Sequence, residues 1–217
     1  MDDAMNYLPI ISTFSAMIPI LAGVWGKFYR QWPYRLFLIF LLLGFLIDLG
    51  GWYMYVSQNS GGNWVLRYTY TLTEPLFYLW FLGYFTHSLI MSKMTKIFMG
   101  ISFLYWLVVL AHHPAFSGYY IFYGVSLAFF SGFLVLEIVE RNKEERFPLT
   151  FWLTFGIFFY NLSTFFIKGL LNSQIAVQLW FLQNLVNIVT NVIFAMGFWL
   201  SWKRILQEES VDKVIIS

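Results

Sequence analysis

Five strongly polar side chains interrupt long apolar runs in this 217-residue sequence, and their types could bind a ligand or move protons. An ionised carboxylate inside a lipid bilayer costs roughly 2.5 kcal/mol or more, so an acid at such a depth predicts a functional site. Two nearby carboxylates could also share a proton and work as acid and base. The five residues are Asp48, Glu74, Asn161, Asn184 and Asn187.

These groups are predicted to lie at one depth. At a rise of about 1.5 Å per residue, Asp48 lies roughly 20 Å from Arg35, which marks one membrane face. Glu74 follows Arg67, a residue near the other face, by seven positions, which places it at a similar depth. The three asparagines fall in the same outer half of the bilayer. The sequence therefore predicts a polar layer shared by four helices.

The spacing of these residues also predicts their direction. Asn184, Asn187 and Asn191 recur at intervals of three and four, so they share one helical stripe that faces other helices rather than lipid. For Asn191 we favour a structural role as an interhelical contact. On another helix, Tyr70 and Glu74 are four residues apart, and Arg67 lies about one turn further out. Arg67 is thus a predicted partner of Glu74, and both Arg67 and Tyr70 are predicted ligand-binding residues.

Pro75 and two glycines are predicted to shape the helices that carry the acids. Proline removes a helical hydrogen bond and pushes against the carbonyl of Thr71, which bends the helix and frees an acceptor. Pro19 is expected to act similarly in the first helix. Gly50 and Gly51 would let the helix of Asp48 pack closely against a neighbour. A cavity is expected at the bend.

The composition is that of a membrane protein. Hydrophobic residues make up 59% of the chain and charged residues 11%, against about 25% charged in a typical soluble domain. Mean hydropathy is +0.67. A net charge of +2 gives no indication of nucleic-acid binding. The absence of cysteine excludes disulfides, thiol catalysis and thiolate metal sites.

Seven apolar segments are long enough, or nearly so, to cross a bilayer core of about 30 Å. No linker could hold a separate unit, so residues 1–217 are predicted to form a single all-α membrane domain, a bundle of seven transmembrane helices. The fourth segment is the shortest. The predicted spans are 8–25, 36–56, 68–91, 97–111, 119–139, 148–171 and 178–202.

The distribution of basic residues predicts the orientation, because cytoplasmic loops are enriched in Lys and Arg. Only Arg67 and Lys168 lie on the opposite side. The N-terminus is therefore predicted outside and the C-terminus in the cytoplasm, as in a multi-pass protein of an inner membrane. The cytoplasmic group is Lys27, Arg30, Arg35, Lys93, Lys96, Arg141, Lys143, Arg146, Lys203 and Arg204.

Several membrane activities are disfavoured by missing residues. A retinal protein of the microbial type needs a lysine in the middle of its last helix, and none precedes Lys203 there. A zinc hydrolase needs converging ligands, whereas His87 is predicted at one face and His112 and His113 at the other. No metal or cofactor is expected, and no nucleophile has an orienting base. A metal-free enzyme that uses the two acids stays open, although the sequence leans away from catalysis.

An internal repeat is suggested when Asp48 is aligned with Asn161. Spans one to three then correspond to spans five to seven, and the fourth span is a connector. This plan is similar to that of sugar transporters of the SWEET class and vitamin-precursor transporters of the PnuC type, and parallel repeats are a known transporter design. The proline–glutamine signature of the SWEET class is absent from this chain.

A second resemblance rests on three motifs, YTLTE (70–74), FYNLSTFF (159–166) and NLVNIVTNVIFAMGF (184–198). They resemble a group of small, uncharacterised seven-helix bacterial proteins that often accompany sensor histidine kinases. The resemblance implies a sensory or signalling role, with Glu74 and the asparagines at matching positions.

The leading hypothesis is a membrane sensor, or the membrane partner of a signalling protein, with a ligand pocket open to the outer side. The alternatives are a small-solute transporter of the three-plus-one-plus-three plan and the metal-free enzyme. The expected partners are the lipid bilayer, an unidentified small molecule and a signalling protein, not nucleic acid. Self-association is left open.

Overall fold

The computed structural model describes residues 2–58, 60–111, 116–142, 147–169 and 176–216, and in these ranges it is helical without strands. The predicted all-α class is thereby confirmed. Predicted features at His112, His113, Lys143, Arg146 and the end of the span 148–171 lie outside the described residues. The elements are α1 (Asp2–Ser15), α2 (Met17–Trp25), the 3₁₀ turn η1 (Phe28–Arg30), α3 (Trp32–Val56), α4 (Ser60–Phe85), α5 (Leu89–Ala111), α6 (Phe116–Arg141), α7 (Leu149–Gly169) and α8 (Ala176–Ile216).

Five of the described helical stretches are long and apolar enough to cross a membrane, which indicates a multi-pass membrane protein. They are Tyr7–Trp25, which combines α1 and α2, and parts of α3, α5, α6 and α8. The described apolar part of α7, Leu149–Phe165, is shorter. Helix α4 carries Arg67 and Glu74 within a less apolar sequence.

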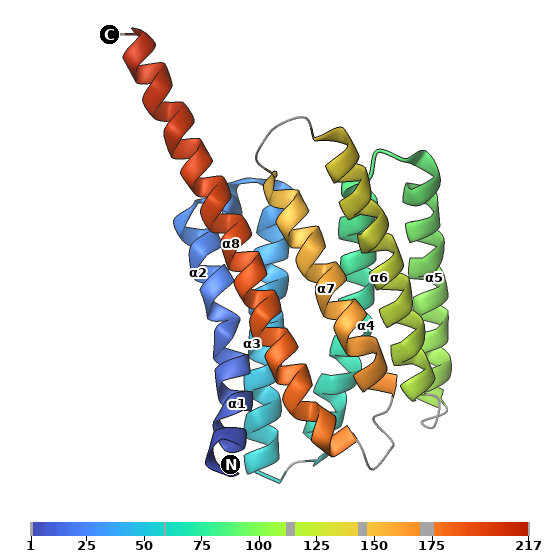
Figure 1. The fold of residues 1–217 in the computed structure, drawn as a ribbon. Helices are drawn as coiled ribbons and strands as arrows, with labels where there is room; N and C mark the ends of the chain where they lie inside the picture. Colours follow the sequence, from blue (N-terminus) through green and yellow to red (C-terminus); the bar gives the residue numbers. More distant parts are fainter. Residues whose placement is uncertain (1, 59, 112–115, 143–146, 170–175, 217) are drawn as a thin grey trace.

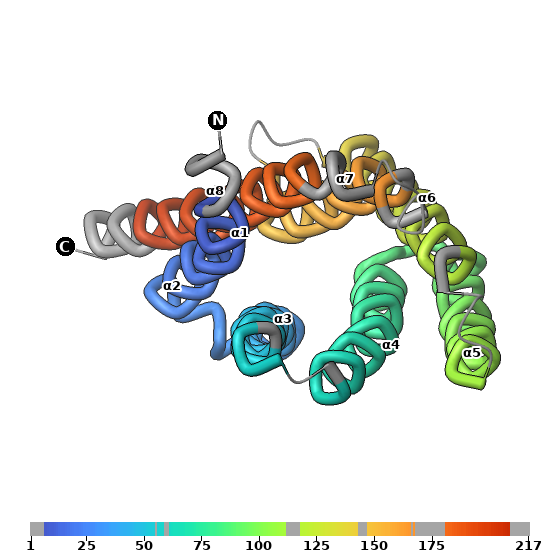
Figure 2. The backbone as a smooth tube through the Cα atoms, turned by 90° about the horizontal axis from the view of Figure 1, so that it is seen from below, coloured from blue at the N-terminus to red at the C-terminus, as the bar shows by residue number. Residues whose placement is uncertain are grey.

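The helices stand side by side (Figure 1). Helix α2 continues the direction of α1, and from α2 onward successive α-helices run in opposite directions (Figure 1). Helix α8 packs against α7 and against both α1 and α2, while α6 packs on α7 and α4 on α5 and α3. Viewed along the bundle, α3 and α4 lie on one side and α7 and α8 on the other (Figure 2). Beyond the bundle, α8 continues as an extended helix toward the C-terminus (Figure 1).

The predicted boundaries of the third and fourth spans were wrong. Helix α4 ends at Phe85 instead of continuing to residue 91, and α5 begins at Leu89, so the fourth span is a full 23-residue helix. The chain turns here because Glu137 of α6 accepts hydrogen bonds from the Thr86 hydroxyl at 2.7 Å and the His87 N–H at 2.9 Å. A carboxylate that is distant in the sequence thus ends α4. The periodicity of apolar residues could not have predicted this contact.

Two prolines lie at or near irregular hydrogen bonding in the helices. Pro75 lies inside α4, and the carbonyl it cannot bond, that of Thr71, instead accepts the Tyr119 hydroxyl at 3.2 Å. The predicted free acceptor is confirmed, and its partner comes from α6. Near Pro19 the first span is interrupted at Ala16, whose N–H bonds to Thr13 at 3.3 Å in a tighter turn.

Glycine brings α3 close to α4, as predicted. A Cβ at Gly50 would lie 3.1 Å from the Leu66 Cδ1 atom, closer than ordinary van der Waals contact. A side chain at Gly50 would require the Leu66 side chain to shift by a few tenths of an ångström. Since α3 carries Asp48 and α4 carries Glu74, this contact holds the two acid-bearing helices together.

Aromatic side chains fill the bundle interior on the side of the C-terminal extension. Phe37 of α3 is fully buried, and its ring centroid lies 5.1 Å from those of both Phe81 of α4 and Phe194 of α8. Phe28 and Phe198 continue the packing at 5.4 Å. We call Phe37, Phe81 and Phe194 the phenylalanine layer. This layer joins α3, α4 and α8, the helices that also carry the polar residues Asp48, Glu74 and Asn191.

Candidate functional site: an acidic cavity within the bundle

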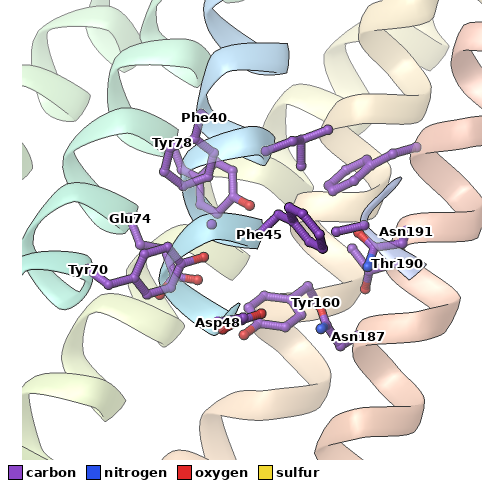
Figure 3. A pocket seen from close by; sticks show the side chains of 14 residues that line it. Phe40, Phe45, Asp48, Tyr70, Glu74, Tyr78, Tyr160, Asn187, Thr190 and Asn191 are labelled. Carbon is purple, nitrogen blue, oxygen red and sulfur yellow. The ribbon is translucent and has the colours of Figure 1, made fainter. Parts of the chain in front are cut away.

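A cavity of about 50 Å³ lies inside the bundle, next to the phenylalanine layer. Since a water molecule needs at least about 10–15 Å³ by this measure, the cavity can hold a few waters or a small polar group. Its lining comes from the α1–α2 junction and from α3, α4, α7 and α8, and Figure 3 shows the labelled side chains directed into it. The lining residues are Ala16, Phe40, Leu41, Gly44, Phe45, Asp48, Tyr70, Glu74, Tyr78, Tyr160, Asn187, Thr190, Asn191 and Phe194.

Glu74 is the buried acid of this site. Its side chain is only 2% exposed, and its Oε2 atom accepts a hydrogen bond of 3.0 Å from the hydroxyl of Tyr123 on α6. Tyr123 is itself fully buried. A hydrogen bond to a charged group is stronger than one between neutral groups, so Tyr123 holds the glutamate in a fixed orientation.

Asp48 occupies a different environment. Its side chain is exposed and lines the cavity. Among the residues that the structure describes, none forms a hydrogen bond or an ion pair with Asp48. The two acids therefore differ: the protein itself holds Glu74 in place, whereas Asp48 is open to whatever enters the cavity.

Arg67 is turned toward α6. Its Nε atom donates to the Tyr120 hydroxyl at 3.4 Å, and its guanidinium carbon lies 5.9 Å from the centroid of the same ring. Arg67 does not line the cavity. Its predicted pairing with Glu74 stays a prediction.

Two of the three asparagines on the α8 stripe face the first helix. The Nδ2 atom of Asn187 donates to Ser12 Oγ at 2.9 Å, and that of Asn191 donates to Ser15 Oγ at 2.8 Å. Both asparagines also line the cavity. The stripe thus joins α8 to α1, and Asn191 forms a contact between these two helices.

The remaining predicted residues lie apart from the cavity. Asn161 is fully buried and its Nδ2 atom donates to the Ile157 carbonyl of its own helix at 2.9 Å. Asn184 is half-buried and is not among the lining residues. The structure therefore gathers Asp48, Glu74, Tyr70 and Asn187 around one space, and leaves Asn161, Asn184 and Arg67 outside it.

Sequence reasoning missed several lining residues. Tyr78 continues the series Tyr70–Glu74 by four more positions, so its i, i+4 spacing could have revealed it. Phe40 precedes Asp48 by eight residues, which is twice the i, i+4 spacing, so the same pattern could have revealed Phe40. Tyr160 carried no such signal, because its neighbour Asn161 is the more polar residue and points in another direction.

The chemistry available is acidic, hydroxylic and aromatic. The described lining contains no serine, histidine or cysteine that could act as a nucleophile or base beside the acids. Within the described part of the chain, no group of three or more acidic, histidine or cysteine residues could hold a metal ion. The arrangement is suited to binding a polar solute.

Comparison of the chain with protein-family models, with curated proteins and with solved structures finds no match. The resemblances drawn from short motifs therefore stay predictions, and the function is inferred from the cavity.

Proposed function

We propose that the chain is a seven-span protein of the bacterial inner membrane that binds a small polar ligand in the outer half of its bundle and acts as a sensor or as the membrane partner of a signalling protein. The observation that carries this proposal is the convergence of Asp48 and Glu74 from neighbouring helices on one cavity. Acids at such a depth in a membrane protein are functional groups by default.

The alternating helix directions support seven crossings. The interrupted α1–α2 pair would be the first crossing, and α3 to α8 would supply the other six. In this arrangement the ends near Gln31, Ser88 and Asn142 fall on one side, together with the C-terminal extension. The basic residues gather at those ends, which makes them the cytoplasmic side by the positive-inside rule.

The phenylalanine layer supports a pocket that opens outward. Phe37 precedes Asp48 by eleven residues on α3, about 16 Å toward the cytoplasmic side. Because Phe37, Phe81 and Phe194 are at most 2% exposed, the interior is closed on that side. A ligand would then reach the acids from the outer face.

Helix α8 supports a sensory role over a purely binding one. The helix that carries Asn187 and Asn191 at the cavity continues without interruption to Ile216. A shift of α8 against α1 at the cavity would therefore be passed along one rigid element to the cytoplasmic extension, where a signalling protein could contact it.

A ligand screen on the purified protein tests this proposal. A panel of small sugars, amino acids, amines and carboxylates is expected to include compounds that raise the thermal stability of the detergent-solubilised protein, since a ligand stabilises the state that binds it. Asp48→Asn and Glu74→Gln should abolish the shift, while Glu140→Gln, an exposed acid at the cytoplasmic end of α6, should preserve it. If no compound stabilises the wild-type protein, the proposal fails.

A small-solute transporter is the second candidate, and one observation favours it. The cavity is lined by α3 and α4 from the first half of the predicted repeat and by α7 and α8 from the second. Uptake of a stabilising compound into reconstituted vesicles, driven by a proton gradient and lost in Asp48→Asn, would decide for transport. Binding without uptake would decide for the sensor.

A further inference from the structure

The charge of the cavity indicates the charge of its ligand. Two carboxylates line it, and no lysine, arginine or histidine does so among the residues that the structure describes. Coulomb interactions are strong in a low-dielectric bundle, so such a site repels anions and attracts cations. This reasoning rests on the proposed ligand-binding function and specifies the class of ligand.

Asp48 provides the anchor for a positive charge. It lines the cavity and forms no hydrogen bond or ion pair with any described residue. Leaving a carboxylate without a partner inside a membrane protein is costly, and intramembrane acids are usually paired. A cation that enters from the outside would supply the missing partner.

Asn191 adds a second acceptor, and its orientation follows from the hydrogen bonds around it. Ser15 donates its hydroxyl proton to the Ser12 carbonyl at 2.6 Å, so its oxygen can only accept the bond from Asn191. The amide nitrogen of Asn191 therefore faces Ser15, and this assigns the positions of the Nδ2 and Oδ1 atoms of the amide. Its Oδ1 atom has no hydrogen-bond partner among the described residues, although the side chain is only 4% exposed and lines the cavity.

The aromatic lining distinguishes an organic cation from an inorganic one. Rings of Phe40, Phe45, Tyr70, Tyr78 and Tyr160 surround the acids. Aromatic faces attract ammonium groups through the ring quadrupole, and most strongly where water is excluded. Divalent metal ions instead require several oxygen ligands, and the described residues contain no group of three acidic or histidine side chains.

We infer that the cavity binds a small organic ammonium ion, whose positive charge lies beside Asp48 and Glu74 and whose alkyl groups contact the rings of Tyr70, Tyr78 and Tyr160. The ammonium N–H or polarised C–H groups would face the Asn191 oxygen. The volume of about 50 Å³ restricts the ligand to a few heavy atoms unless side chains at the mouth move aside.

Choline chloride is a suitable probe because 3,3-dimethylbutan-1-ol has the same shape without the charge. Methylammonium chloride is measured beside it, because this ion has only two heavy atoms and needs no movement of the side chains at the mouth. Binding to the detergent-solubilised full chain is measured by thermal shift and by calorimetry, against sodium chloride at equal ionic strength. Choline is expected to stabilise the wild-type protein and the neutral alcohol is not. Asp48→Asn and Glu74→Gln should each weaken choline binding by at least about tenfold, as the loss of a charged contact does.

A pair of variants tests the aromatic contact. Tyr160→Phe keeps the ring and should bind choline within about twofold of wild type, whereas Tyr160→Leu should weaken binding about three- to tenfold. The wild-type protein and Glu140→Gln are measured as controls. Glu140→Gln removes an acid outside the cavity and should bind choline as the wild-type protein does.

The outcomes separate this inference from the function on which it rests. Equal shifts with choline and the neutral alcohol, or with choline and sodium, would overturn the ammonium assignment. If a sugar or a carboxylate stabilises the protein through Asp48 while neither choline nor any amine does, the binding function stands and the ammonium inference is wrong. If nothing in either set binds, both are wrong.

Discussion

Asn191 has two roles in one side chain. Its amide nitrogen joins α8 to Ser15 of the first helix, and the same side chain lines the cavity. The spacing of the asparagines predicted the interhelical contact but not the serines that accept it. Ser12 and Ser15 are three residues apart, and they meet Asn187 and Asn191, which are four apart.

Removing both partners of this contact should reveal their coupling. In a cycle of Ser15→Ala, Asn191→Leu and the double variant, we expect a coupling free energy of roughly 0.6–1.7 kcal/mol, the range found for hydrogen bonds between membrane helices. Reversible unfolding in mixed micelles measures it. Thr190→Val is the control, because the Thr190 hydroxyl donates to the Val186 carbonyl of its own helix at 2.8 Å and bonds to no described residue of α1. Coupling as large between Ser15 and Thr190 would contradict the assignment.

At the scale of elements, α4 is shaped by a proline and by the helix beside it. Pro75 leaves the Thr71 carbonyl without its helical donor, and Tyr119 supplies the missing hydrogen bond from α6. One turn along α6, Tyr123 bonds to Glu74. Two tyrosines of α6 thus fix both the bent backbone of α4 and its acid.

Restoring the helical donor should make the tyrosine hydroxyl dispensable. Tyr119→Phe is expected to destabilise the wild-type protein by about 1 kcal/mol, because the Thr71 carbonyl loses the hydrogen bond that Tyr119 donates. In a Pro75→Ala background the alanine N–H can bond to Thr71, so the same substitution should cost much less. Unfolding free energies of the four proteins test this. Equal costs in both backgrounds would show that the hydroxyl does not compensate for the proline.

At the scale of the whole molecule, sequence patterns predicted the helical class and the apolar stretches because lipid imposes a strong compositional signal. The depth of these residues in the predicted helices and their spacing along the chain placed Asp48, Glu74, Tyr70 and Asn187 together, and the structure has all four lining one cavity. They could not exclude Asn161, because depth does not give the direction of a side chain around its helix. They could not find Glu137, whose bonds to Thr86 and His87 connect residues about 50 positions apart.

The proposed seven crossings and their proposed orientation are testable because the chain has no cysteine. Single cysteines at the exposed positions Ser57 and Ala111 should react with a membrane-impermeant maleimide in intact spheroplasts. Cysteines at Gln31 and Glu140, at the opposite ends of the helices, should react only after permeabilisation. A fully reversed pattern would contradict the orientation, and a mixed pattern would contradict the number of crossings.

The phenylalanine layer also has an electrical consequence. Water in a cavity that opens outward shares the potential of the outside solution, so the voltage across the membrane would fall mainly over the thin dry region around Phe37, Phe81 and Phe194. Moving one charge through the full potential involves about 2.3 kcal/mol per 100 mV. A cation that stops beside Asp48 would cross only a small part of that field. Occupancy of the site would then follow the external concentration of the ligand and be nearly independent of the energised state of the cell.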